Sequence, residues 1–186
     1  MATGLLFVTA PNADFKVINP FLIYARDWEF GEEDTWDNFH LVTSRNASYF
    51  NQFKDSPRND LATTKPGDVT VENFSNQWAG TSVRDIEQHI LSIDDSESDG
   101  IDISVFLVID EQSLQDRTCI MAERYTWNDD VDPWEQRLKG AQKKHYDFNK
   151  YRAPWDETYI VFVNLSLGNL RFDEYANEDE GTDEEG

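Results

Sequence analysis

The chain has 186 residues, which is enough for one domain with a sizeable hydrophobic core. Its 37 acidic and 16 basic residues give a net charge of −21, which repels phosphate groups and argues against nucleic-acid binding. No apolar run reaches the roughly 18 residues of a membrane span, and Leu5–Ala10 is too short for a signal-peptide core. Because Cys119 is the single cysteine, no internal disulfide can form, and we expect a cytoplasmic protein.

The first third of the chain contains two predicted elements. After a modest apolar start, Pro11 and Asn19–Pro20 indicate a loop, and Phe21–Ala25 is the first strand candidate. A short helix is then expected over Glu32–Val42, because acidic residues in its first turn favour the positive end of the helix dipole. A strand, an acidic turn and a helix in this order predict the start of an α/β unit.

A polar, turn-rich stretch follows over residues 43–80, in which Val69 and Val71 alternate with polar neighbours and predict a short edge strand. A clearer helix begins at Ser82. Ser82 and Asp85 have the spacing of a capping box, and the next apolar residues keep to one helical face: Val83, Ile86, Ile90 and Ile93.

The most apolar stretch, Ile101–Asp110, is predicted to be the central strand. Val105–Ile109 is an unbroken apolar run with acidic residues at both ends, which is typical of a strand covered on both faces. A short polar link over Gln112–Arg117 leads to a second strand at Cys119–Tyr125. Because Cys119 lies in an apolar run, it is expected to be a small core residue rather than a nucleophile.

The C-terminal part of the chain leaves one element open. A helix is expected from Pro133 to Lys144 and a strand at Asp147–Ala153. Trp155–Leu167 fits a strand by propensity, but Pro154 and the acidic residues after it fit a helix start. Asn169 is expected to cap a last helical turn through Tyr175. Residues 177–186 hold six carboxylates and no apolar residue, which predicts a disordered acidic tail.

Residues 164–176, NLSLGNLRFDEYA, resemble the closing signature N-L-S-[IL]-[AG]-N-[ML]-x-F-[DE]-E-[FY]-A. That signature belongs to a family of small bacterial and fungal proteins described as a domain of unknown function. Three stretches are similar to earlier parts of the family, in the same order: Phe21–Ala25 with Asp27, Asp34 and Trp36; Val105–Asp110 with Ser113-Leu114; and Met121–Arg124. The resemblance implies a helix before the signature, which favours helix for Trp155–Leu167. It implies no activity and no catalytic residues.

An acidic turn after the first predicted strand is the main candidate site. Open α/β sheets place ligands at the carboxyl ends of their strands, and paired carboxylates there suit acid–base chemistry or a divalent ion. Two tryptophans beside them suit stacking on a ligand. The simpler alternative is a helix N-terminus with favourable charges and tryptophans that serve the core. The candidate binding residues are Asp27, Trp28, Glu32, Asp34 and Trp36. The acidic turn also contains Glu29 and Glu33.

Other motifs are weak. Asp95–Gly100 resembles the first half of a calcium-binding EF-hand loop, but the position that needs a bidentate acid is Phe106, so a solvated loop is expected. The three histidines lack metal-site spacing. Because no nucleophile elbow, phosphate-binding loop or dinucleotide fingerprint occurs, no catalytic residue, metal ligand or cofactor is assigned.

The sequence therefore predicts a single α/β (or α+β) domain over residues 1–176, with a mixed sheet of about four to five strands and flanking helices. Inserts lie near residues 43–80 and 126–146, and the acidic tail follows. The leading functional hypothesis is a binding module for a basic protein, of the inhibitor or immunity type. The alternatives are a hydrolase or metal-dependent enzyme that uses Asp27–Asp34, and a structural subunit with an exposed apolar patch.

Overall fold

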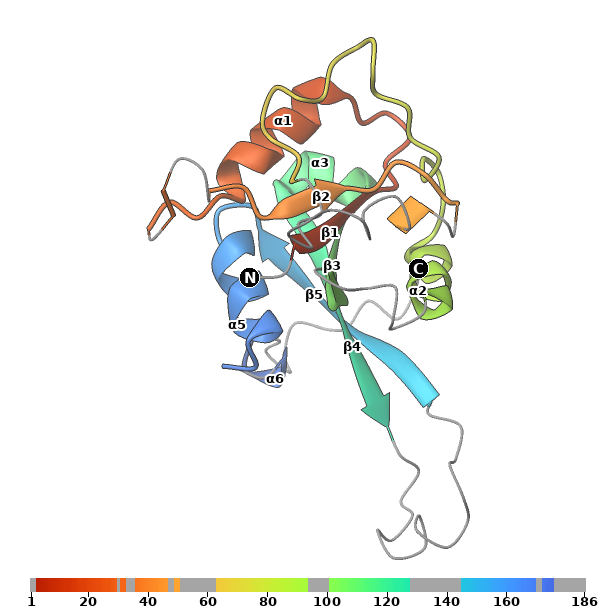
Figure 1. Ribbon diagram of the computed structural model, residues 1–186, viewed down its shortest axis with the longest axis vertical. Helices are drawn as coiled ribbons and strands as arrows, with labels where there is room; N and C mark the ends of the chain where they lie inside the picture. Colours follow the sequence, from red (N-terminus) through yellow and green to blue (C-terminus); the bar gives the residue numbers. More distant parts are fainter. Residues whose placement is uncertain are drawn as a thin grey trace, which may run out of the picture.

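The computed structural model describes residues 3–29, 31–32, 36–46, 49–50, 63–93, 101–127, 145–169 and 172–175. These residues form a five-stranded mixed sheet with the order β2-β1-β3-β4-β5 (Figure 1). The first three strands are parallel, β4 runs antiparallel to β3, and β5 runs antiparallel to β4. The predicted fold class is confirmed. The strand bounds are β1 (Thr3–Val8), β2 (Phe39–Leu41), β3 (Ile101–Ile109), β4 (Thr118–Trp127) and β5 (His145–Pro154).

The predicted central strand is β3, the middle strand of the five. Its alternate side chains enter two separate cores: Leu107 and Ile109 pack on one face of the sheet, and Phe106 and Val108 pack on the other. All four are fully buried. A strand buried on both faces needs an apolar residue at every position, which explains the unbroken run in the sequence.

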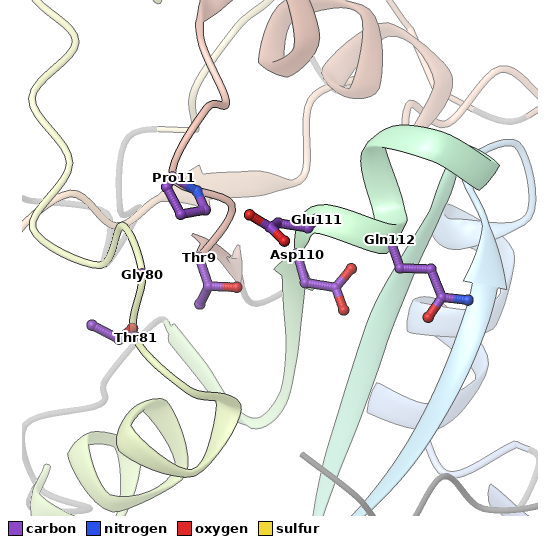
Figure 2. Close-up of a pocket in the computed structure, with 7 residues that line it drawn as sticks. All are labelled: Thr9, Pro11, Gly80, Thr81, Asp110, Glu111 and Gln112. Atoms are coloured by element: carbon purple, nitrogen blue, oxygen red, sulfur yellow. The ribbon is translucent and has the colours of Figure 1, made fainter.

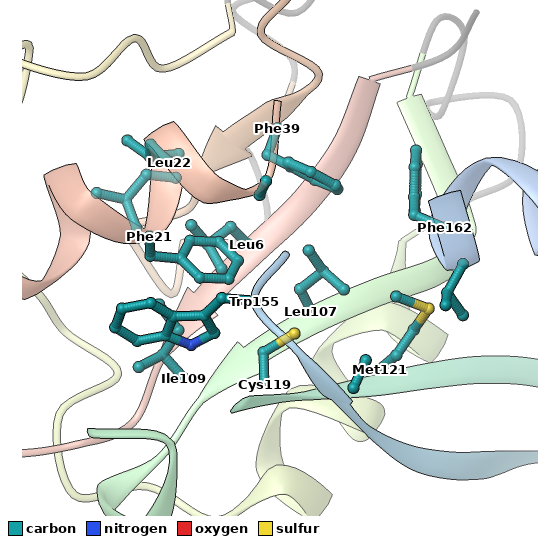
Figure 3. Packing of buried hydrophobic residues seen from close by; sticks show 14 of the residues in the cluster. Leu6, Phe21, Leu22, Phe39, Leu107, Ile109, Cys119, Met121, Trp155 and Phe162 are labelled. Carbon is teal, nitrogen blue, oxygen red and sulfur yellow. The ribbon is translucent and has the colours of Figure 1, made fainter. Parts of the chain in front are cut away.

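Helices cover both faces of the sheet. On one face lie α1 (Phe15–Tyr24) and α5 (Thr158–Ser166), which contribute Phe21 and Phe162 to the core drawn in Figure 3. On the other face α2 (Val83–Ser92) contributes Ile86 and Ile90. The short helix α3 (Glu111–Asp116) joins β3 to β4, and α6 (Phe172–Tyr175) ends the described chain.

Elements with local sequence signals are confirmed. Ser82 caps α2, and its hydroxyl and the Asp85 carboxylate each bond the other residue's backbone N–H, which is the predicted capping box. The strands predicted at Cys119–Tyr125 and Asp147–Ala153 lie within β4 and β5. The ambiguous stretch Trp155–Leu167 contains helix α5, as the family resemblance implied.

The first predicted strand is wrong: Phe21–Ala25 is the second half of α1 and its C-cap. Asp14 caps this helix by accepting a hydrogen bond from the Lys16 backbone N–H, and Pro20 lies inside it. The proline suggested a loop, but the buried residues follow the helical period of three and four: Ile18, Phe21, Leu22 and Ala25. The strand that was missed is β1, whose six residues are all buried between β2 and β3.

Two further predictions are corrected. Residues 39–41 of the expected Glu32–Val42 helix form β2, which pairs with β1 in parallel through three residues. Here the partner strand overrides the helical interpretation, because β2 buries all its side chains at the edge of the sheet. Val69 lies in irregular chain and Val71 in a turn rather than in an edge strand, with Val69 buried and Val71 71% exposed.

Some predictions lie outside the described residues. They are the helix from Pro133 to Lys144, the calcium-like loop Asp95–Gly100 and the acidic tail 177–186. Within the described parts of the chain, no helix has both the length and the apolar character needed to cross a membrane.

Candidate functional site

The predicted acidic turn lies at the amino ends of the parallel strands, whereas it was expected at their carboxyl ends. Because α1 is a helix, the chain runs along it from the carboxyl end of β1 back toward the amino ends of the parallel strands. The turn joins α1 to β2 there, and Asn38 near its end accepts a hydrogen bond from the backbone N–H of Gly4 at the start of β1. The rule that places ligands at the carboxyl ends of strands therefore does not apply to this turn.

Asp27 is a buried anchor of the turn rather than an exposed ligand group. It is 7% exposed, and its Oδ2 accepts a hydrogen bond of 2.7 Å from the Tyr159 hydroxyl of α5. Burial raises the pKa of Tyr159, and the Asp27 carboxylate raises it further, so the hydroxyl stays protonated as the donor. The Asp27 backbone N–H also donates to the Trp36 carbonyl. The hydrogen bond from Tyr159 therefore ties the turn to the first turn of α5.

Arg26 organises the two tryptophans of the turn. Its guanidinium lies 5.7 Å from the Trp28 ring and 5.4 Å from the Trp36 ring, and its Nε pairs with Asp37 at 2.9 Å. The rings of Trp28 and Trp36 are 5.4 Å apart. Each indole N–H also donates to a backbone carbonyl, of Ile23 and Gly31 respectively. The positive charge of Arg26 therefore interacts with Asp37 and the two indole rings within the turn.

The outer surface of the turn combines large apolar groups with carboxylates. Trp28 is 57% exposed and bonds the carbonyl of Ile23, which is itself exposed, as is Tyr24. The Tyr24 ring lies 6.1 Å from Trp155, which directly precedes two exposed acids of the α5 start. We call this surface the aromatic–acidic face, and define it as Ile23, Tyr24, Trp28, Glu29, Asp156 and Glu157.

The other predicted site residues are placed as follows. Trp36 is partly buried behind Trp28, Glu32 is exposed, and Asp34 lies outside the described residues together with Glu33. In the described part of the turn, Asp27 and Asp37 bond different partners, Tyr159 and Arg26. The described residues contain no group of three or more His, Cys, Asp or Glu side chains that converge as metal ligands.

A pocket that the sequence reasoning missed lies at the carboxyl ends of β1 and β3 (Figure 2). Its volume is about 400 Å³, and its lining residues follow β1, precede α2 and follow β3: Thr9, Pro11, Gly80, Thr81, Asp110, Glu111 and Gln112. The signal was present in the sequence, because Asp110 directly follows the buried run of β3. The rule for strand ends was applied to Phe21–Ala25 instead, which is not a strand.

Asp110 joins four elements beside this pocket. Its two carboxylate oxygens accept hydrogen bonds of 3.1 and 2.7 Å from the Arg152 guanidinium of β5. The Ser113 hydroxyl and backbone N–H of α3 donate to it as well, and Arg152 also contacts Thr118 of β4. Burial disfavours the ionised form of Asp110, but these donors outweigh burial and hold its pKa below the usual range.

Cys119 is expected to be unreactive in the folded protein. It is fully buried, its Sγ lies 3.2 Å from the Thr158 hydroxyl, and burial raises the pKa of the thiol to about 12. Because the thiolate is the reactive form, a maleimide reagent at neutral pH should leave the native protein unlabelled and add once in denaturing urea. Labelling of the folded protein at the rate of a free thiol would contradict the assigned burial.

Comparisons with known proteins bear on the family rather than on an activity. Searches of the curated proteins and of the solved structures found no match. A family model does match, from residue 29, just after α1, to the end of the chain. The matched family is described as a domain of unknown function, DUF6924, and because its model covers residues 29–186 the protein belongs to that family.

Proposed function

We propose that this protein is a binding module that recognises a basic protein partner through its aromatic–acidic face. The observation that carries the proposal is the exposed Trp28, whose indole N–H bonds the carbonyl of the exposed Ile23 and whose ring contacts Trp36 and Arg26. Large apolar side chains that gather on a surface mark interaction sites more often than scattered ones. The charge of the border then determines which partners approach.

The apolar part of the face is suited to a binding hot spot. Trp and Tyr are enriched among the residues that dominate interface energies. Trp28 is held by the Ile23 carbonyl and by its contacts with Trp36 and Arg26, so little side-chain entropy remains to be lost on binding. A pre-ordered aromatic side chain with more than half its surface exposed therefore offers contact area at a low entropic cost.

The charge of the face supports a basic partner. Glu29 directly follows Trp28 in the chain, Asp156 and Glu157 directly follow Trp155, and all three acids are exposed. Arg26 is already paired with Asp37. The net charge of −21 adds a long-range attraction for a cationic protein. An inhibitor of a basic enzyme or toxin fits this charge pattern, because such pairs gain association rate from opposite fields.

The proposal predicts that Trp28→Ala weakens partner binding strongly. The protein serves as bait in an extract of its own cells at low and at high salt, and the captured partner is identified and purified. Its affinity is then measured by calorimetry. We expect at least a tenfold loss for Trp28→Ala, a smaller loss for Asp156→Asn with Glu157→Gln, and weaker binding at high salt.

Leu91→Ala is the matched control, because Leu91 is a 41% exposed apolar residue on α2, away from the face. Equal losses for Leu91→Ala and Trp28→Ala, or binding that does not change with salt, would contradict the proposal. A stable homodimer of the pure protein in light scattering, abolished by Trp28→Ala, would assign the face to self-association instead. A bait that ends at Ala176 measures what residues 177–186 contribute.

A further inference from the structure

The pocket at the carboxyl ends of β1 and β3 lies between the segment that follows β1 and the segment that precedes α2. The chain leaves β1 for α1 on one face of the sheet and enters β3 from α2 on the other face. The segments that lead into α1 and into α2 therefore diverge beside the carboxyl ends of β1 and β3, where the N–H of Gly80 meets the Thr9 carbonyl. Open α/β sheets bind ligands in such a crevice, because loops from both sides can contact one molecule. This position is at the opposite end of β1 from the aromatic–acidic face.

Several hydrogen-bond donors of the pocket wall, around Thr9, Gly80 and Thr81, already have partners within the protein. The backbone N–H groups of Thr9 and Ala10 both donate to the Ile109 carbonyl, and the N–H of Gly80 donates to the Thr9 carbonyl. The Thr81 hydroxyl donates to the carbonyl of Trp78. These donors are thus used within the protein, whereas carboxylate and hydroxyl oxygens remain on the lining. A ligand that brings its own donors complements such a surface.

Glu111 supplies the net negative charge. Its carboxylate is exposed, and Figure 2 shows it directed toward Pro11 and Thr9, whereas Asp110 points away from Pro11. The charge of Asp110 is balanced by Arg152, whose guanidinium bonds both of its oxygens. Because Asp110 is engaged in this way, Glu111 is the lining carboxylate available to a cationic ligand.

We propose that this pocket binds a small aliphatic amine, with its ammonium group at Glu111 and its methylene groups against the Pro11 ring. A volume of about 400 Å³ suits a small organic molecule, since ligand pockets start at about 300 Å³. A divalent metal ion needs several oxygen ligands at once, and Asp110 is already engaged by Arg152 and Ser113. An anion would meet the unbalanced carboxylate of Glu111. The inference is independent of the proposed partner binding.

Three probes of similar length test the charge preference: the diamine putrescine, the diol butanediol and the dicarboxylate succinate. Each is titrated into the full chain and followed by backbone amide chemical shifts. Putrescine is expected to shift the amides of Thr9, Gly80 and Glu111 in a saturable manner and to bind more tightly than the other two. Butanediol or succinate binding at least as tightly, or no shift at these amides with putrescine, would overturn the proposal.

Glu111→Gln is the decisive variant, because it removes the charge and keeps the shape of an exposed side chain. It is expected to weaken putrescine binding about two- to fivefold, as loss of a solvent-exposed ion pair does. Glu174→Gln removes the same charge at an exposed position of α6, outside the pocket lining, and should leave putrescine binding unchanged. Equal affinity of wild type and Glu111→Gln, or equal losses in the two variants, would refute the site. Far-UV circular dichroism checks that both variants fold.

Discussion

Phe162→Ala is expected to lower the free energy of unfolding by about 3–5 kcal/mol, the largest effect that we predict for a single substitution. Phe162 is fully buried on α5, and its ring lies 4.9 Å from that of Phe39 on β2. Removing the ring opens a cavity between the helix and the parallel end of the sheet, where the surrounding backbone is held by strand pairing. Urea unfolding followed by circular dichroism measures the loss.

Gly4 borders this cavity, because its lack of a side chain leaves the space that the Phe162 and Phe39 rings occupy. A Cβ at Gly4 of β1 would lie 2.6 Å from the Phe162 Cζ and 2.8 Å from the Phe39 Cδ1, so the glycine leaves room for both rings. Gly4→Ala alone is expected to cost about 1–3 kcal/mol through overpacking. In the Gly4→Ala, Phe162→Ala double variant the new methyl group enters the cavity, and the loss should be smaller than the sum of the single losses.

Ile160→Ala on the same helix is the control, because Ile160 is 45% exposed and should lose less than about 1 kcal/mol. If Phe162→Ala is too unstable to fold, Phe162→Leu provides a milder test of the same contact. Strict additivity of Gly4→Ala with either Phe162 substitution would contradict the packing of these two residues against each other.

Asp110→Asn is expected to lower the free energy of unfolding by about 1–3 kcal/mol at neutral pH. It removes a carboxylate that accepts two hydrogen bonds from Arg152 and leaves that guanidinium without its charge partner. Both side chains are about one quarter exposed, at 26% for Arg152 and 25% for Asp110, so solvent reduces the effect below that of a fully buried pair.

The same pair predicts a dependence on pH. The folded pKa of Asp110 lies below its ordinary value of 3.8, because the hydrogen bonds outweigh burial. Its stabilisation is therefore fully present above that ordinary value and is lost as the pH falls through the folded pKa. The difference in unfolding free energy between wild type and Asp110→Asn should shrink in this acidic range. Asp156→Asn, at an exposed position, is the control, and a difference that stays constant with pH would refute the ionic contribution.

Local signals in the sequence were sufficient for several elements. The capping box of Ser82 and Asp85 works within one helical turn, so its residues alone predict the start of α2. The apolar run Val105–Ile109 is long enough to require burial on both faces, which indicates a central strand. The family resemblance resolved α5, for which residue preferences alone allowed both a helix and a strand.

The positions of the candidate sites depended on whether each segment reaches the amino or the carboxyl ends of the parallel strands. Trp28 and Glu32 were proposed from their residue types, and both are exposed on the described turn. Their setting was wrong because one misassigned element, a strand in place of α1, exchanges the carboxyl and amino ends of the sheet. The same exchange hid the pocket after Ile109, although the acidic residue at the end of β3 was visible in the sequence.

The amino-acid sequence by itself determined the charge, the family, the central strand and the helix that begins at Ser82, because composition and short-range periodicity carry these properties. Only the tertiary structure decided that Thr3–Val8 is a second interior strand, that Asp27 bonds Tyr159 across 132 positions, and that Asp110 meets Arg152. These contacts join residues far apart in the chain. Their partners are chosen by the order and direction of strands, which no local pattern specifies.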